Sequence, residues 1–233
     1  MNLDPNTLIT AAVQLLILLM AISVHEAAHA WTALRCGDST AFEAGRVSLN
    51  PLRHIDLFGS ILVPIILAIS GGPVFGWARP TPVRIARLRN PDRDHLLVTV
   101  AGPLSNALLG FMALAVLAVM LPLLGEEAGP TATASLVRDF ESAAKSSSFP
   151  IVFTLVQAAF LNGFLAILNL LPIPPLDGGQ IVLQLLPPEW AARYSSVGRY
   201  GFMIVLGLAI LNVLVILVMP VYVIIAMVIS LSS

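Results

Sequence analysis

Long apolar runs, separated by short polar and proline-rich stretches, dominate the pattern of this 233-residue chain. A helix needs about 20 mostly apolar residues to cross a bilayer, and four segments are long enough. They run roughly over Leu8–Leu34, His95–Leu124, Pro150–Leu171 and Gly201–Leu231. The pattern therefore predicts an all-α polytopic membrane protein with about four to six transmembrane helices.

Two apolar segments leave alternatives open. The last one, 201–231, is overlong and contains Asn212 and Pro220, so it forms either one kinked helix or two pieces. The stretch Leu57–Ser70 has only about 14 residues and ends at Gly71-Gly72-Pro73. That length favours a re-entrant or interfacial segment over a full span.

Two polar stretches between the apolar runs predict extended backbone. Phe42–Leu49 alternates apolar and polar residues, which is typical of a strand. Trp77–Val83 contains prolines, which favour extended backbone in the residues before them. We therefore expect a small β-hairpin or re-entrant element on the cytoplasmic side. The whole chain, 1–233, is expected to form one membrane-embedded domain, with a core over 8–180 and a C-terminal helix over 199–231.

Composition agrees with a membrane protein. Charged residues make up 11% of the chain, against about 25% in an average soluble domain. The net charge of −1 suggests no nucleic-acid partner. One cysteine, Cys36, excludes an internal disulfide.

The basic residues predict the topology. If Leu57–Ser70 re-enters the membrane, ten of the 12 basic residues share one side, and basic loops favour the cytoplasm. We therefore expect the N-terminus outside and the end of the first helix at the cytoplasmic side. The ten are Arg35, Arg46, Arg53, Arg79, Arg84, Arg87, Arg89, Arg93, Arg193 and Arg199.

The first apolar helix carries a metal-binding pattern, His25-Glu26-Ala27-Ala28-His29. Residues four apart lie one turn apart on the same helix face, so both imidazoles can reach one ion. In this arrangement two histidines hold zinc and the glutamate serves as general base. Ionisable groups are costly in lipid and mark a functional site there.

A catalytic zinc site uses three protein ligands, and Asp177 is the best candidate for the third. It follows three prolines, precedes two glycines and lies in an apolar context. The predicted topology returns it to the depth of His25. The alternative is an ordinary helix-capping aspartate at a membrane-exit turn.

These residues resemble those of the site-2 proteases, which are intramembrane zinc metalloproteases. The resemblance rests on the motif 25–29 and on Asn169-x-x-Pro-x-Pro-x-Leu-Asp177-Gly178. Ala101-Gly102-Pro103-Leu104-Ser105-Asn106 is similar to that family's motif in the intervening helix. The resemblance covers roughly 24–179 and implies a compact member without a PDZ domain.

The resemblance implies roles for six residues. His25, His29 and Asp177 would bind one zinc ion, and Glu26 would move a proton from the attacking water to the leaving amine. Asn106 and Asn169 would hold substrate backbone or the oxyanion. An interhelical hydrogen bond is the alternative for both asparagines.

The implied activity is regulated intramembrane proteolysis of transmembrane protein substrates in the lipid bilayer of the cell membrane, near its cytoplasmic side. A metal transporter or sensor is one alternative, and Glu26 argues against it because transport needs no base between ligands. A catalytically inactive relative is another. Every expected ligand is present, so nothing in the sequence supports loss of activity.

Overall fold

The structure is a computed structural model that describes residues 5–69, 77–137 and 139–232. Within these residues, four helices are long and apolar enough to cross a membrane. They are α1 (Pro5–Arg35), α4 (Pro91–Leu124), α7 (Phe149–Asn169) and α11 (Val213–Ser232). The prediction of an all-α polytopic membrane protein is confirmed.

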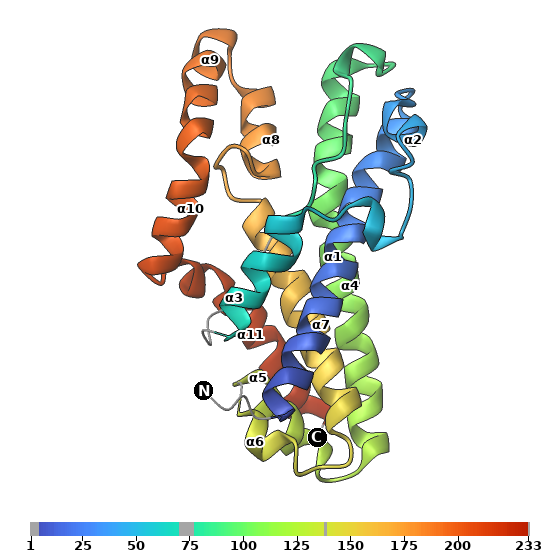
Figure 1. Ribbon diagram of the computed structural model, residues 1–233, viewed down its shortest axis with the longest axis vertical. Coiled ribbons are helices and arrows are strands. Elements are labelled where there is room, and N and C mark those ends of the chain that lie inside the picture. Colours follow the sequence, from blue (N-terminus) through green and yellow to red (C-terminus); the bar gives the residue numbers. More distant parts are fainter. Residues whose placement is uncertain (1–4, 70–76, 138, 233) are drawn as a thin grey trace.

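The helices α1, α4 and α7 form the central bundle, and α11 packs against α4 and α7 (Figure 1). One buried apolar cluster joins α4, α7 and α11, and includes Leu117, Val156 and Ile225. A second joins α1, α7 and α11 through Leu18, Phe164 and Val218. The three central helices therefore have fixed positions relative to one another, and they carry most of the candidate site.

Short helices lie at both ends of this bundle (Figure 1). At the end where α1 finishes and α4 begins lie α2 (Thr40–Glu43), η3 (Ile85–Arg87), α8 (Asp177–Leu185) and α9 (Pro188–Val197). At the opposite end lie α5 (Ala128–Leu136) and α6 (Phe140–Ala143). The arginine-rich loops therefore gather at the first of these ends.

The segment predicted to re-enter forms η2 (Leu57–Leu62), followed by α3 (Val63–Ile69). Thirteen helical residues reach about 20 Å, short of a core about 30 Å thick. The Trp77 N–H donates to the Gly59 carbonyl at 3.1 Å, so the chain is back at the start of η2. This contact supports re-entry over crossing. The predicted Gly71-Gly72-Pro73 end lies outside the described residues.

The predicted strand over Phe42–Leu49 is wrong, and the residues described by the structure contain no β-strand. The chain instead forms α2, the 3-10 turn η1 (Pro51–Arg53) and irregular loop. Asp38 begins α2 by accepting hydrogen bonds from the N–H and the hydroxyl of Thr40. A turn with Gly45 at φ +69° follows. These local side-chain hydrogen bonds have overridden a short alternation that no neighbouring strand supports.

The last apolar segment is two pieces. After η4 (Gly198–Tyr200) the helix α10 (Gly201–Ile210) ends at Ile210, and α11 starts at Val213. Asn212 between them has φ 57°, a left-handed conformation that asparagine tolerates better than most residues. Pro220 lies inside α11. The break therefore falls at the asparagine, and the predicted C-terminal helix over 199–231 is divided there.

Candidate metal centre

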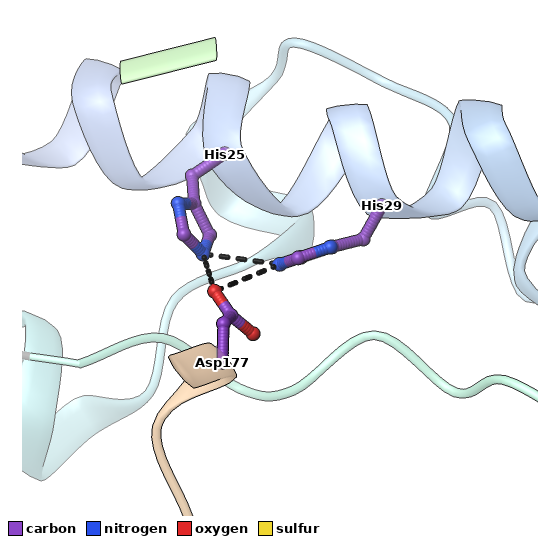
Figure 2. Close-up of side chains that lie close together, drawn as sticks. All are labelled: His25, His29 and Asp177. Carbon is purple, nitrogen blue, oxygen red and sulfur yellow. Dashed lines mark hydrogen bonds and ion pairs between the residues drawn. The ribbon is translucent and has the colours of Figure 1, made fainter. Parts of the chain in front are cut away.

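Three potential metal ligands converge between α1 and the first residue of α8 (Figure 2). His25 and His29 project from successive turns of α1, with their Nε2 atoms 3.1 Å apart. The Asp177 Oδ2 atom lies 3.2 Å from His25 Nε2 and 3.5 Å from His29 Nε2. Tetrahedral ligands about 2.0–2.1 Å from zinc lie about 3.3 Å from one another. The spacing of the three atoms therefore fits one zinc ion.

The protonation of the two imidazoles also fits a metal. His25 Nδ1 lies 2.7 Å from the Asn106 Oδ1 atom, and His29 Nδ1 lies 2.7 Å from the Val98 carbonyl oxygen. Both partners are acceptors, so each Nδ1 donates, and in the neutral form each ring presents the lone pair of Nε2. Asp177 Oδ2 is buried without a hydrogen bond from the described residues. Three converging lone pairs are costly unless a cation compensates them.

A chain of amides across three helices sets the orientation of Asn106. The Asn162 amide group on α7 donates to the Ala158 carbonyl at 2.9 Å, which turns its Oδ1 toward α4. Asn106 then donates to Asn162 Oδ1 at 3.0 Å and to the Ala21 carbonyl at 3.1 Å. Its own Oδ1 must therefore face His25. This network assigns the amide orientations and the tautomer of His25.

A glycine in α4 gives the histidines their room. A Cβ atom at Gly102 would lie 2.3 Å from His29 Nε2 and 2.7 Å from His25 Cε1. No real side chain fits at such distances, so α4 can pass behind the ligand pair only with glycine here.

Glycines also hold the irregular segment before Asp177. A Cβ at Gly178 would lie 2.3 Å from the Leu170 oxygen, and one at Gly179 would lie 2.4 Å from the Pro174 nitrogen. Close backbone approach is thus what these positions require. From the far side, Gly201 of α10 lies so close to the Pro174 carbonyl that a Cβ would meet its oxygen at 1.8 Å.

The polypeptide from 77 to 84, which we name the strap, runs beside α1 toward α4 (Figure 1). Two of its backbone N–H groups donate to carbonyls, Trp77 to Gly59 and Arg79 to His54. Two others donate to carboxylates, Thr81 to Glu26 and Arg84 to Asp38. These contacts fix an irregular segment against the metal centre without a sheet. The strap therefore takes the place that the sequence assigned to a β-hairpin.

Asp38 anchors the far end of the strap. Its carboxylate is fully buried and accepts from Thr40 and, at 2.6 Å, from the Arg84 N–H. Burial opposes ionisation, but the hydrogen bonds from Thr40 and Arg84 outweigh it, so the pKa of Asp38 lies below its usual value.

Glu26 lies beside the ligands and contacts the strap. Its Oε2 atom accepts from the Thr81 N–H at 2.8 Å, and the Thr81 hydroxyl donates to the Glu26 carbonyl at 3.1 Å. Sequence reasoning did not identify Thr81. The only signal was its place between two prolines, in a stretch predicted to be extended next to the motif.

The site opens into a cavity of ≈ 730 Å³ whose lining includes His25, Glu26, Asp177, Asn169 and Phe202. Asn169 is half-buried, and its amide group donates to the Leu165 carbonyl at 3.0 Å. Asn106 is fully buried, with its oxygen and its nitrogen both engaged in the network described above. The two asparagines predicted to bind substrate therefore have different surroundings, and only Asn169 combines partial exposure with a place on the cavity wall.

Comparisons with known proteins agree with this chemistry. Peptidase family M50 matches residues 13–214 of the chain. Relatives that bear the description "Putative zinc metalloprotease" include YwhC and Rip2. YwhC of Bacillus subtilis (strain 168) is 38% identical over 192 residues, which cover 82% of this chain and 77% of YwhC.

Rip2 of Mycolicibacterium smegmatis is 32% identical over 192 residues, which cover 82% of this chain and 64% of Rip2. The match therefore spans less than two thirds of the length of Rip2. No solved structure gives a significant match.

Proposed function

We propose that this chain hydrolyses peptide bonds within transmembrane segments of other membrane proteins. The premise is that the chain belongs to peptidase family M50 and is a multi-pass, zinc-dependent metalloprotease of the site-2 type. One observation carries the proposal. The ligand group and Glu26 line a cavity whose wall includes the membrane-spanning helices α1, α4 and α7. A substrate reaching them from the lipid would arrive as a membrane segment. Such cleavage is the reaction of regulated intramembrane proteolysis.

In this proposal His25, His29 and Asp177 hold the zinc ion, whose Lewis acidity activates water and the scissile carbonyl when it is bound. Glu26 accepts the proton of the attacking water at its carboxylate and returns it to the leaving amine. Asn169 donates or accepts hydrogen bonds with the substrate backbone. Asn106 holds His25 in the tautomer that presents Nε2, a positioning role that its complete burial favours over substrate contact.

The active site is proposed to lie near the cytoplasmic face of the cell membrane. Trp31, two residues after His29, is 55% exposed, and Arg35 lies 5.6 Å from its ring centroid. Tryptophan favours the membrane interface, and arginine-rich loops favour the cytoplasm. With Cys36 replaced, a cysteine at Arg84 should resist an impermeant external thiol reagent, whereas one at Glu127 should react. Labelling at both positions would contradict this topology.

Substrates are proposed to unwind before cleavage. A helical peptide bond is shielded by its own turn, so attack requires extended backbone. Glycine or proline near the scissile bond should therefore speed cleavage, and leucine in the same positions should slow it. Equal rates across such a substrate series would argue against unwinding.

The test of the proposed function uses the detergent-purified chain and a synthetic peptide with one membrane-spanning segment and a central glycine–proline pair. The wild-type protein should cleave it, and a zinc chelator should stop cleavage. Glu26→Gln preserves shape and removes the base, so it should keep zinc and lose at least about 100-fold in kcat. Asp177→Ala should lose zinc as well as activity.

These variants separate the alternatives. A transporter or sensor would bind zinc without cleaving any such peptide. An inactive relative would bind zinc and the peptide, and Glu26→Gln would change neither property. Substantial turnover by Glu26→Gln would overturn the role assigned to Glu26.

A further inference from the structure

We infer that Arg46 and the peptide group between Pro80 and Thr81 form a positioning relay that holds the carboxylate of Glu26. The inference rests on the role proposed above for Glu26 and adds two residues to the machinery of that role. Neither Arg46 nor Thr81 takes part in the proton transfer itself. Each acts through Glu26.

The first part of the relay is the pair of hydrogen bonds that Thr81 donates to Glu26. The Thr81 N–H donates to Oε2 at 2.8 Å, and the hydroxyl of the same residue donates to the Glu26 main-chain carbonyl at 3.1 Å. A hydrogen bond to an ionised acceptor is stronger than a neutral one. One strap residue therefore contacts both the side chain and the backbone of Glu26, which restricts rotation of the carboxylate.

The second part is the buried guanidinium of Arg46. Its side chain donates to the carbonyls of Arg53 and, at 3.4 Å, Pro80, and the residue is only 6% exposed. Among the described residues, no carboxylate oxygen lies within ion-pair distance of it. Burial, with a smaller contribution from Arg79, lowers the pKa of Arg46, and the negative charge of Glu26 opposes that shift. Glu26 is thus the anion whose field reaches this buried cation.

The two parts meet in one peptide group. The Pro80 carbonyl and the Thr81 N–H belong to the same planar unit, with the carbonyl facing the cation and the N–H facing the anion. A peptide dipole oriented in this way is stabilised at both ends, and hydrogen bonds in series polarise one another. The loop that contains Arg46 therefore acts on Glu26 without contacting it.

Orientation matters because a general base must lie within hydrogen-bond reach of the proton that it accepts, and small misplacements of a catalytic group are costly in rate. Glu26 is half-buried at the cavity wall and, without the relay, could rotate away from the ligand group. The relay thus explains why Arg46 is buried and why its guanidinium binds carbonyls of two separate loop segments.

The kinetic test compares variants on the synthetic membrane-spanning peptide described above. Thr81→Pro removes the N–H donor in a position where its proline neighbours already favour extended backbone. It should lower kcat roughly 10- to 100-fold with KM and zinc content unchanged. Thr81→Val is the matched control, because it loses only the hydroxyl, and it should lower kcat less than about threefold.

Arg46→Met should lower kcat in the same direction, and Arg46→Lys, which keeps the charge and a donor, should restore most of it. In a Glu26→Gln background, neither Thr81→Pro nor Arg46→Met should reduce the residual rate further, because both act through the removed carboxylate. Wild-type kcat in both single variants, or additive losses in the double variants, would overturn the relay.

A second measurement needs no substrate. Proline has no N–H, so Thr81 supplies the only backbone amide of residues 80–82, and its hydrogen exchange can be followed by mass spectrometry. Glu26→Ala and Arg46→Met should speed this exchange at least severalfold, whereas Glu26→Gln, which keeps an acceptor, should change it little. Unchanged exchange in Glu26→Ala would overturn the relay. Failure of the wild-type protein to cleave the peptide would count against the proposed function alone.

Discussion

The metal centre joins two regions that are built in different ways. The histidines lie on α1, a continuous helix of 31 residues, and α4 packs against them through Gly102. Asp177 instead follows an irregular segment after α7, and α9 and α10 contact that segment from the other side. The Tyr194 hydroxyl of α9 donates to the Pro172 carbonyl at 2.8 Å, and Gly201 of α10 packs on Pro174.

The difference shows which kind of packing each ligand needs. Helical periodicity by itself brings His25 and His29 to one face, so their environment has only to leave room and set the tautomers. No local periodicity places Asp177 beside them, so its position depends on contacts with distant helices. We therefore expect the histidine side to be sensitive to added volume and the aspartate side to be sensitive to displacement of its supporting elements.

The largest effect is expected from Gly102→Ala on the histidine side. The new methyl group would overlap both imidazoles, so zinc affinity should fall more than about 100-fold and cleavage should be lost. Gly110→Ala on the same helix is the control, because its nearest contacts would be 3.4 Å or longer. The measurement is the zinc content of each variant after competition with a chelator. Wild-type zinc affinity in Gly102→Ala would contradict the described packing.

On the aspartate side, Gly201→Ala should push the Pro174 segment and Asp177 away from the histidines. Because two ligands remain in place, we expect a smaller loss of zinc affinity, roughly 10- to 100-fold. Gly207→Ala in the same helix is the control, since a Cβ there would meet nothing within 4 Å. If both alanines behave alike in a zinc titration, the support of Asp177 by α10 is refuted.

A smaller effect is expected from Asn162→Leu, which tests the amide network of the histidine side. Asn106 would lose the acceptor that fixes its orientation, and the favoured tautomer of His25 would be destabilised. Zinc affinity should fall about tenfold. Asn169→Leu on the same helix should keep wild-type zinc affinity and lose cleavage. Equal zinc affinities in these two variants would show that the network does not tune the site.

The smallest effect concerns the strap. Folding lowers the pKa of Asp38. The ionised carboxylate therefore stabilises the folded protein above about pH 4. This stabilisation is lost as the pH falls through the pKa of Asp38 in the folded state. Asp38→Asn should therefore speed hydrogen exchange of the Arg84 amide a few-fold at pH 6. The difference from wild type should shrink toward pH 3. A difference that does not change with pH would exclude the carboxylate charge as its cause.

Predictions from the sequence succeeded where a residue's neighbours along the chain decide its structure. Apolar length identified the spans, and four-residue spacing placed the histidine pair on one helix face. The short length of Leu57–Ser70 favoured re-entry, which stays a prediction. The prediction failed at Phe42–Leu49, where the side chain of Asp38 and a turn at Gly45 produce a helical turn and a loop. A six- to eight-residue alternation carries too little information to exclude such local side-chain hydrogen bonds and turns.

The sequence by itself determined the membrane-protein class, the two histidines with their adjacent glutamate and the candidacy of Asp177, because helical periodicity and the high cost of ionisable groups in lipid are properties of the chain alone. Tertiary structure decided the close approach of the Asp177 segment to α1, the burial of Asn106 against His25, and the contacts of Arg46 with Pro80 and of Thr81 with Glu26. These contacts join residues that are 34 to 152 positions apart in the sequence. Their formation depends on how the helices and the strap pack together, which no local pattern specifies.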